Sequence, residues 1–242
     1  MEKEDLFGKT LTELKEICLQ FGLPAFSARQ ISEWIYQKDI PDIDSMSNLS
    51  LKNRTILKES FNLGITPHSK VQESVDGTKK YLFPTRNLKF IEAAYIPETD
   101  RATLCVSSQI GCKMGCLFCM TGKQGFQGNL TAGEILNQVK ELPEREKLTN
   151  IVYMGMGEPL DNIEEVLKSL EILTSEWGFG TSPRRITVST IGIIPALESF
   201  INRSDCHLAI SLHTPFDDER KKLMPVQNIY PIEEVIKFVK QF

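Results

Sequence analysis

Three cysteines lie within one short stretch of the chain, at Cys112, Cys116 and Cys119. Their spacing, Cys-x3-Cys-x2-Cys, predicts one loop whose three thiolates bind a single metal centre. A [4Fe–4S] cluster normally takes four cysteine ligands, and no fourth cysteine follows nearby in the sequence. Three ligands leave one iron open to a substrate. An enzyme needs this arrangement to bind and reductively cleave S-adenosylmethionine (SAM).

Zinc is the main alternative to an iron–sulfur cluster at such a loop. A tetrahedral zinc site takes a fourth cysteine or histidine at a typical spacing. His207 and His213 are distant in the sequence and belong to another predicted element. The chain has six cysteines among 242 residues, so three in one stretch indicate a site rather than a chance cluster. The spacing therefore favours the iron–sulfur cluster and leaves zinc open.

The composition is that of an ordinary globular protein, with 41% hydrophobic and 25% charged residues. A chain of 242 residues can form a substantial core and a smaller appended domain. Its first five residues lack the apolar run of a signal peptide, and no apolar stretch is long enough to cross a bilayer. We therefore expect a cytoplasmic protein without membrane segments, whose clustered thiols stay reduced.

The overall charge gives no sign of nucleic-acid binding. The formal net charge is −4 and the sequence pI is about 5.6, whereas nucleic-acid-binding surfaces are basic. Local basic clusters at Lys79–Lys80, Arg184–Arg185 and Arg220–Lys222 are interpreted as solvated surface. An RNA substrate would have to be inferred from other features.

The first hundred residues divide into two parts. Residues 1–65 predict a small helical accessory domain, whose first helix starts at a capping-box pattern formed by Thr10 and Glu13. Two further short helices follow in this part. Residues 66–100 predict a β-rich connector of three strands, with Asp76–Gly77 as a hairpin turn.

From residue 101 onward the sequence alternates between strands and helices. The pattern predicts strands at 102–107, 150–154, 185–189 and 207–212, and helices at 131–142, 163–176, 195–201 and from 232. Repeated βα units predict an α/β fold with parallel strands and a binding site at their carboxyl ends. Four strands are too few to close an eight-stranded barrel. Residues 101–242 are therefore predicted to form an incomplete barrel, and we expect further βα units in a longer chain.

Polar or glycine-rich groups follow three of these strands, and the fourth leads into the cysteine loop. Gly157 and Glu158 follow one strand, where glycine lets a ligand approach the backbone and the carboxylate can bind an ammonium group. Ser189 ends another strand, and the run Ser211-Leu212-His213 ends the last, with groups that can bind ribose hydroxyls and a purine edge. Each group alone also fits a cap or a turn. Together, beside three cysteines, they predict a cofactor pocket.

With these residues the chain resembles the radical SAM adenosine C2 methyltransferases, the dual-specificity family of 23S rRNA and tRNA methyltransferases often called RlmN. The resemblance extends over nearly the whole chain. It rests on the segments Leu104–Cys112, Cys112–Cys119, Gly125–Phe126, Asn129–Thr131, Met154–Pro159, Ser189–Thr190 and Ser211–His213, and on Ala28–Gln30 and Trp34–Tyr36 of the helical region.

The resemblance implies a partial radical SAM (βα) barrel with two cofactors, a [4Fe–4S] cluster and SAM. It implies that Cys112, Cys116 and Cys119 hold the cluster. Gly157 and Glu158 would contact the methionine end of SAM. Ser189, Ser211, Leu212 and His213 would contact its ribose and adenine. In the same way, Cys105 is implied as a second catalytic cysteine and Glu92 as the proton acceptor.

The resemblance also implies a reaction on RNA. One SAM methylates a cysteine near the carboxyl terminus, and a second SAM is cleaved to a 5′-deoxyadenosyl radical that activates this methyl group for addition to adenine C2. An electron donor such as flavodoxin or ferredoxin drives the cleavage. Cys105 would then form a disulfide with the methyl-bearing cysteine and release the RNA.

The chain departs from the family pattern because it has no cysteine after Cys206. Cys206 opens a strand and Cys18 lies on the apolar face of a helix, so both are assigned to packing. We therefore expect the chain to be a fragment of a longer enzyme, less stable than that enzyme and inactive on RNA alone. Two alternatives stay open, a C8 methyltransferase of the related Cfr type and a non-catalytic, metal-stabilised RNA-binding module.

Overall fold

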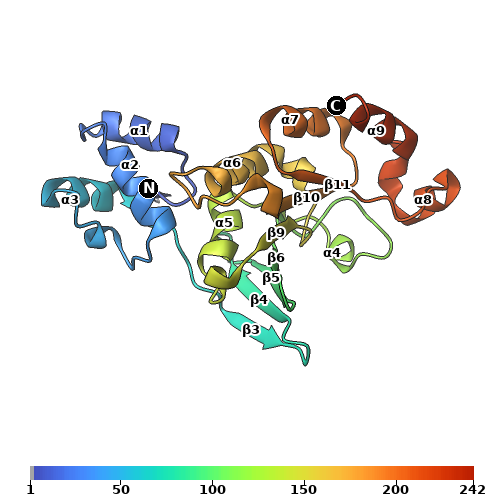
Figure 1. Cartoon of the computed structure of the whole chain (residues 1–242), viewed down its shortest axis with the longest axis horizontal. Helices are drawn as coiled ribbons and strands as arrows, with labels where there is room; N and C mark the ends of the chain where they lie inside the picture. Colours follow the sequence, from blue (N-terminus) through green and yellow to red (C-terminus); the bar gives the residue numbers. More distant parts are fainter. Residues whose placement is uncertain (1–2) are drawn as a thin grey trace.

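The computed structural model describes residues 3–242, which build one seven-stranded sheet flanked by helices (Figure 1). The strands in spatial order are β11 (His207–Ile210), β10 (Ile186–Thr190), β9 (Asn150–Tyr153), β6 (Ala102–Cys105), β5 (Phe90–Pro97), β4 (Lys79–Pro84) and β3 (Lys70–Glu73). Strands β6, β9, β10 and β11 are parallel, and β3 to β6 are antiparallel. The predicted α/β fold with four parallel strands is confirmed. The strands predicted for the connector continue the same sheet.

The two faces of the sheet differ because side chains alternate along each strand. The strand register places Cys105 between Ala94 of β5 and Val152 of β9, and all three are half-buried on one face. Leu104 and Ile151 point to the other face and are fully buried. That face packs under α5 (Ala132–Lys140), α6 (Ile163–Thr174) and α7 (Ile194–Arg203). We call the half-buried side the open face of the sheet.

The helical region at the amino terminus lies at one end of the molecule (Figure 1). It consists of α1 (Leu11–Gln20), α2 (Ser27–Ser32), the π-helical turn η1 (Glu33–Gln37), η2 (Ile43–Ser45) and α3 (Leu51–Ser60). The predicted capping box is present, since the Thr10 hydroxyl accepts from the Glu13 backbone and the Glu13 carboxylate accepts from Thr10 N–H. A short parallel pair, β1 (Glu4–Asp5) with β2 (Phe61–Asn62), ties the two ends of this region together and is not predicted from sequence.

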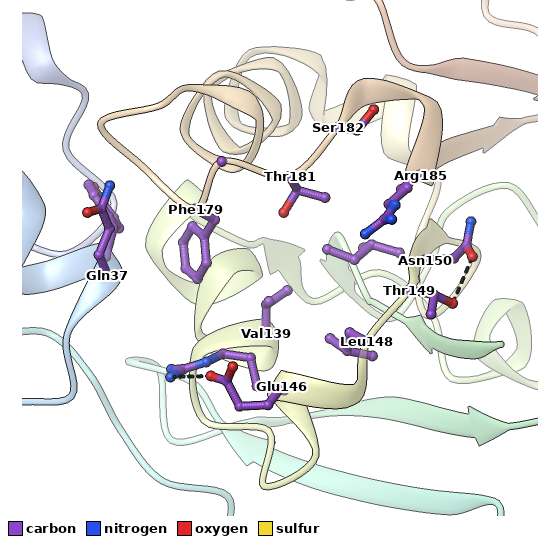
Figure 2. A pocket seen from close by; sticks show the side chains of 14 residues that line it. Gln37, Val139, Glu146, Leu148, Thr149, Asn150, Phe179, Thr181, Ser182 and Arg185 are labelled. Atoms are coloured by element: carbon purple, nitrogen blue, oxygen red, sulfur yellow. Dashed lines mark hydrogen bonds and ion pairs between the residues drawn. The ribbon is translucent and has the colours of Figure 1, made fainter. Parts of the chain in front are cut away.

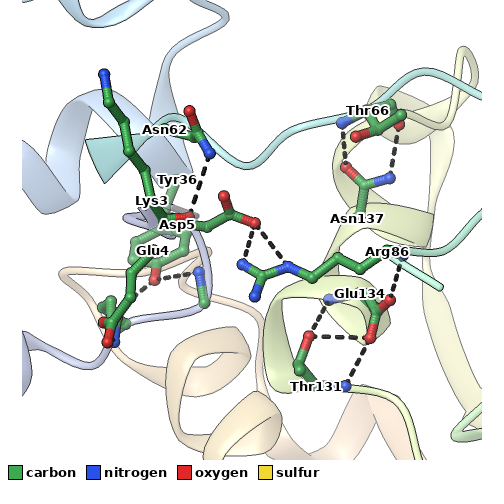
Figure 3. Close-up of polar contacts among 12 residues, drawn as sticks. Lys3, Glu4, Asp5, Tyr36, Asn62, Thr66, Arg86, Thr131, Glu134 and Asn137 are labelled. Atoms are coloured by element: carbon green, nitrogen blue, oxygen red, sulfur yellow. Dashed lines mark hydrogen bonds and ion pairs between the residues drawn. The ribbon is translucent and has the colours of Figure 1, made fainter. Parts of the chain in front are cut away.

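Polar contacts join the helical region to the sheet and its helices (Figure 3). The Arg86 guanidinium donates from Nε to Asp5 Oδ2 at 3.0 Å, while the Arg86 backbone N–H donates to Glu134 Oε1 at 3.0 Å. The Asn137 amide of α5 exchanges two hydrogen bonds with the backbone of Thr66, at 3.1 and 2.7 Å. These bonds fix the segment that leads from the helices into β3.

Two glycines allow the backbone of the amino-terminal segment to touch α5. A Cβ on Gly8 would lie 2.5 Å from Gly133 N, and one on Gly133 would lie 2.8 Å from the Phe7 carbonyl oxygen. Above this contact the Tyr36 hydroxyl accepts from Gly8 N–H at 3.2 Å and donates to the Lys9 carbonyl at 2.5 Å. The buried apolar residues of helices and sheet form one continuous cluster. The division into accessory, connector and core domains stays a prediction.

Most of the remaining elements surround the carboxyl ends of the parallel strands (Figure 1). They are β7 (Gln109–Ile110), α4 (Met120–Lys123), β8 (Gly128–Asn129), η3 (Arg145–Lys147), η4 (Pro159–Asn162), η5 (Pro183–Arg185), α8 (Asp217–Leu223), η6 (Pro225–Asn228) and α9 (Ile232–Val239). Among them, η3 and η5 precede β9 and β10 at the other ends of those strands. No helix within residues 3–242 is long and apolar enough to cross a membrane.

Candidate active site

The cysteine loop is closed at its base by the antiparallel pair of β7 and β8. Gly111 has φ +72°, and a Cβ there would lie 1.8 Å from the Gly125 carbonyl oxygen, so the closure requires glycine. Farther along the loop, Leu117 N–H donates to the Leu223 carbonyl of α8 at 2.9 Å. The loop is therefore anchored both to the core and to α8.

A cavity of about 260 Å³ opens between this loop and the carboxyl ends of β9, β10 and β11. Its lining includes Cys112, Cys116, Cys119, Gly157, Glu158, Ser189, Ser211 and His213. The structure thus brings together residues spread over a hundred positions of sequence. Leu212, predicted with this group, is exposed and is not among the lining residues. Cys105 and Glu92 also lie outside the lining.

The three thiols have the chemistry that an iron–sulfur cluster requires. Burial raises the pKa of the Cys112 thiol, and burial together with the charges of Cys112 and Cys119 raises the pKa of Cys116 to about 11. The metal-free protein therefore holds Cys116 protonated at neutral pH, and iron binding must release that proton. No three His, Cys, Asp or Glu residues within 3–242 converge on a point that could hold one metal ion. In a cubane each cysteine binds its own iron, so the three residues fit a [4Fe–4S] cluster.

Glu158 is buried beside the cysteines and already has three hydrogen-bond donors. Its Oε1 accepts from Thr190 Oγ1 at 2.6 Å and from Leu160 N–H at 3.1 Å, and its Oε2 accepts from Ile191 N–H at 3.1 Å. Burial outweighs these bonds and raises the pKa of Glu158 to about 7. The carboxylate therefore fixes the ends of β9 and β10 to each other. An ammonium group bound in the cavity would have to share the Glu158 carboxylate oxygens with these three donors.

The glycines before Glu158 have close contacts within the chain. Gly157 has φ +97°, and a Cβ there would lie 2.5 Å from the Gln109 Cβ. A Cβ on Gly155 would lie 2.7 Å from the Val106 carbonyl oxygen. These contacts require glycine with or without a ligand, and the contact of Gly157 with SAM stays a prediction. The backbone of Gly157 still lines the cavity.

The groups predicted to bind a nucleoside lie at the ends of β10 and β11. Ser189 Oγ and Ser211 Oγ are 3.3 Å apart, within hydrogen-bond distance, and both line the cavity. His213 has φ +59°, and its ring packs on Phe118 of the cysteine loop with ring centroids 4.2 Å apart. This contact joins the strand end to the loop between Cys116 and Cys119.

Cys105 and Glu92 share the open face of the sheet with Ser189. Cys105 pairs with Ala94, two residues from Glu92 along β5, so both side chains point to the same side. Burial raises the pKa of Cys105. Glu92 is exposed and forms an ion pair with Lys80, Nζ to Oε1 at 3.0 Å. Their predicted catalytic roles stay predictions.

Gln109 is a residue of the site that sequence reasoning misses. Its buried amide accepts from Glu158 N–H at 2.9 Å and donates to Asn129 Oδ1 at 2.8 Å and to Asp161 Oδ2 at 2.7 Å. Asp161 also pairs with Lys113 of the cysteine loop at 2.8 Å. Gln109 therefore ties the loop to the segment after β9. Its partners lie 20 to 52 residues away along the chain, so no local sequence signal marks it.

The basic cluster at Arg220–Lys222 corrects another expectation. Lys221 and Lys222 are exposed, but Arg220 is 0% exposed. Its guanidinium Nη2 donates to the carbonyl oxygens of Ile191 at 3.1 Å and Ser211 at 3.3 Å. The interpretation as solvated surface is therefore wrong for Arg220, because α8 turns this residue under the strand ends.

A larger cleft of about 370 Å³ lies on the opposite side of the sheet (Figure 2). Its lining includes Gln37 of the helical region, Asn150 at the start of β9 and Arg185 just before β10. The cleft is therefore at the amino ends of the parallel strands, whereas ligands of α/β sheets bind at the carboxyl ends. It contains none of the predicted cluster or cofactor residues.

Comparison with known proteins identifies the family. The Radical SAM superfamily pattern matches residues 106–242, and the ribosomal RNA large subunit methyltransferase N-terminal domain pattern matches residues 4–63. A probable dual-specificity RNA methyltransferase RlmN from Phocaeicola vulgatus is 57% identical over 240 residues, which cover 99% of this chain and 69% of the relative. The chain belongs to the RlmN-type radical SAM methyltransferase family. Its cofactors are accordingly a [4Fe–4S] cluster and SAM.

More distant relatives support the same family assignment. The dual-specificity RNA methyltransferase RlmN of Geotalea uraniireducens is 42% identical, with 100% of this chain and 71% of the relative covered. A crystal structure of a radical SAM methyltransferase from Sphaerobacter thermophilus superposes with a TM-score of 0.88 at 41% identity. That match covers 97% of this chain and 71% of the other. The α/β fold of the RlmN-type family is thus shared along nearly the whole chain.

Proposed function

We propose that the chain belongs to a radical SAM enzyme that methylates C2 of adenosine in rRNA and tRNA. Residues 1–242 contain no cysteine after Cys206 that could carry the methyl group, so we do not expect them to methylate RNA alone. The observation that carries the proposal is the single cavity that gathers the three cysteines, Glu158 and the two strand-end serines in a chain of the RlmN-type family. The names of its relatives supply the RNA substrate.

Different residues of the cavity bind the cluster and the two ends of SAM. Cys112, Cys116 and Cys119 hold the cluster, which when bound supplies one electron to the SAM sulfonium. Gly157 and Glu158 take the methionine end of SAM. This assignment uses the position of Glu158 next to the cysteines and its buried carboxylate.

The nucleoside end of SAM is assigned to the opposite side of the cavity. Ser189 and Ser211 present hydroxyls that now bond to each other and can turn to ribose. The ring of His213, held against Phe118, closes the cavity beside the cysteine loop. Leu212 is exposed beside them, where its apolar side chain can cover the adenine.

Glu92 and Cys105 are assigned to the RNA side of the reaction. Both point to the open face, where Glu92 presents an exposed carboxylate that pairs with Lys80. Cys105 is the thiol that releases the RNA. Residues 1–65 form the accessory domain that contacts the RNA, residues 66–100 the connector and residues 101–242 the radical SAM core. A flavodoxin or ferredoxin in the cytoplasm supplies the electron.

Anaerobic reconstitution with iron and sulfide tests the cofactor assignment. We expect about four irons and four sulfides per chain, and cleavage of SAM to 5′-deoxyadenosine and methionine when a low-potential reductant is added. Cys119→Ala should lose iron and cleavage together. Cys206→Ala, which replaces a buried cysteine outside the cavity, is the matched control and should retain both. One tightly bound zinc without SAM cleavage would instead support a metal-stabilised binding module.

A gene deletion tests the RNA product. Mass spectrometry of nucleosides from rRNA and tRNA of the deletion strain should show loss of 2-methyladenosine. Restoring the gene should restore the nucleoside, whereas restoring it with Glu92→Gln should not. Loss of 8-methyladenosine with 2-methyladenosine intact would contradict the C2 assignment.

A further inference from the structure

Arg220 is a fully buried cation that the proposed reaction does not use. It lies on α8, with 0% of its surface exposed. The guanidinium donates to Gln227 Oε1 and to the backbone carbonyls of Ile191 and Ser211, at the ends of β10 and β11. Its Nε has no hydrogen-bond partner. A cation in this position is held by neutral acceptors.

No carboxylate within residues 3–242 forms an ion pair with Arg220 at 4 Å or less. Asp217, one helical turn earlier, accepts instead from the Gln227 amide at 2.9 Å. An unpaired buried charge costs several kcal/mol unless an opposite charge compensates it. The fold therefore holds a positive charge that no carboxylate within residues 3–242 contacts directly, with Asp217 linked to it only through Gln227.

The nearest source of such a charge is the cysteine loop. Cys116 packs with Met224 and Ile191 in a small apolar cluster directly beside Arg220. The hydrogen bond from Leu117 N–H to the Leu223 carbonyl holds the loop against the same helix. Cys116 carries a negative charge only as a thiolate, the form in which it would hold a cluster. Arg220 thus bonds to the Ile191 carbonyl, next to the cluster against which Cys116 packs, and does not line the cavity.

We propose that Arg220 is the buried counter-charge of the three thiolate ligands and makes the site easier to reduce. The proposal rests on the cluster assigned above. Three thiolates around a [4Fe–4S] core of charge +2 give a net charge of −1, and uptake of one electron from a reductant gives −2. A fixed positive charge in a site shielded from water favours the more negative state, which raises the reduction potential.

The alternative is a scaffold role, in which Arg220 only joins the strand ends to α8. The two roles predict different behaviour of two variants. Arg220→Gln keeps hydrogen-bond donors but removes the charge. Arg220→Lys keeps the charge but loses the planar fork that reaches three acceptors. Arg203→Gln is a matched control, since Arg203 is exposed, pairs with Glu164 and does not line the cavity.

The test is an anaerobic redox titration of the reconstituted proteins, followed by electron paramagnetic resonance of the reduced cluster. For Arg220→Gln we expect the equilibrium constant for one-electron reduction to fall at least about tenfold, a shift of about 59 mV to lower potential. Arg220→Lys should stay within about threefold of the wild type, and Arg203→Gln should not change. Iron content and melting temperature report on folding.

Several outcomes would overturn the inference. An Arg220→Gln protein that loads iron and has the wild-type potential shows that the charge does not act on the cluster. If Arg220→Gln takes up no iron, Arg220→Lys decides. If Arg220→Lys takes up iron and has the wild-type potential, the result supports the role of the charge. If Arg220→Lys takes up no iron, or if its equilibrium constant shifts tenfold, the result supports the scaffold role. If the wild type itself takes up no iron, the proposed function fails and not this inference alone.

Discussion

Replacing Glu158 by glutamine should change how the stability of the iron-free protein depends on pH. Burial raises the pKa of Glu158 from 4.5 to about 7 in the folded state. The protonated form is therefore favoured by folding. The stability that this group contributes is fully present below pH 4.5 and is lost as the pH rises through 7.

The size of the effect follows from the two pKa values. At about 1.36 kcal/mol per pKa unit, the complete loss is about 3 kcal/mol. Part of it has already occurred at pH 5, so between pH 5 and pH 8 the wild type should lose about 2–3 kcal/mol through Glu158. Glutamine has no charge to bury, so Glu158→Gln lacks this loss. It should also carry a constant penalty of about 1–3 kcal/mol, because an amide cannot serve all three donors.

Urea unfolding at a series of pH values measures both the pH-dependent loss of stability in the wild type and the constant penalty of Glu158→Gln. The experiment uses iron-free protein under anaerobic, reducing conditions, so that neither the cluster nor a disulfide contributes. The informative quantity is the difference between wild type and Glu158→Gln, because all other titrating groups cancel in it. The stability of the wild type minus that of Glu158→Gln should fall by about 2–3 kcal/mol between pH 5 and pH 8. Parallel pH curves for the two proteins would refute the assignment of a raised pKa to Glu158.

Two further predictions concern the contact between the amino-terminal helices and α5. Gly133→Ala should destabilise the protein by about 1–3 kcal/mol in urea unfolding, because its Cβ would lie 2.8 Å from the Phe7 carbonyl oxygen. Gly122→Ala, where the nearest atom is 3.5 Å away, should be neutral or slightly stabilising. Lys140→Met should cost about 1–3 kcal/mol, because the buried ammonium donates to two carbonyls of the helical region. Exposed Lys147→Met should cost nothing measurable, and equal losses in both lysine variants would contradict the reasoning.

Local signals in the sequence are sufficient to predict the helices that start with a capping residue and the strands that are bounded by turns and rich in apolar residues. Thr10 with Glu13 forms the predicted capping box, and Thr131 with Glu134 forms another. The strands at β6, β9, β10 and β11 appear within a few residues of their predicted bounds. These elements depend on residues at most four positions apart, so a single sequence contains the information.

Helix α8 shows what such signals miss. Its sequence Asp-Asp-Glu-Arg-Lys-Lys-Leu has no apolar stripe, so neither the helix nor a buried residue is expected there. Arg220 is buried only because carbonyls at the ends of two strands and Gln227 meet around it. Gln109 is similar, with partners from two separate segments, Asn129 on β8 and Glu158 and Asp161 after β9. Such residues are defined by the tertiary fold and have no local pattern.

The order of the sheet explains why the predicted residues converge even though some of their contacts differ from expectation. Each parallel strand buries one set of alternate side chains under α5, α6 and α7, which fixes the direction of the other set. Cys105 and Ser189 must then share the open face, and every strand must end at the same edge as the cysteine loop. Shifting a strand by one residue would bury its functional groups under the helices. The hydrophobic pattern of the core therefore also specifies the geometry of the site.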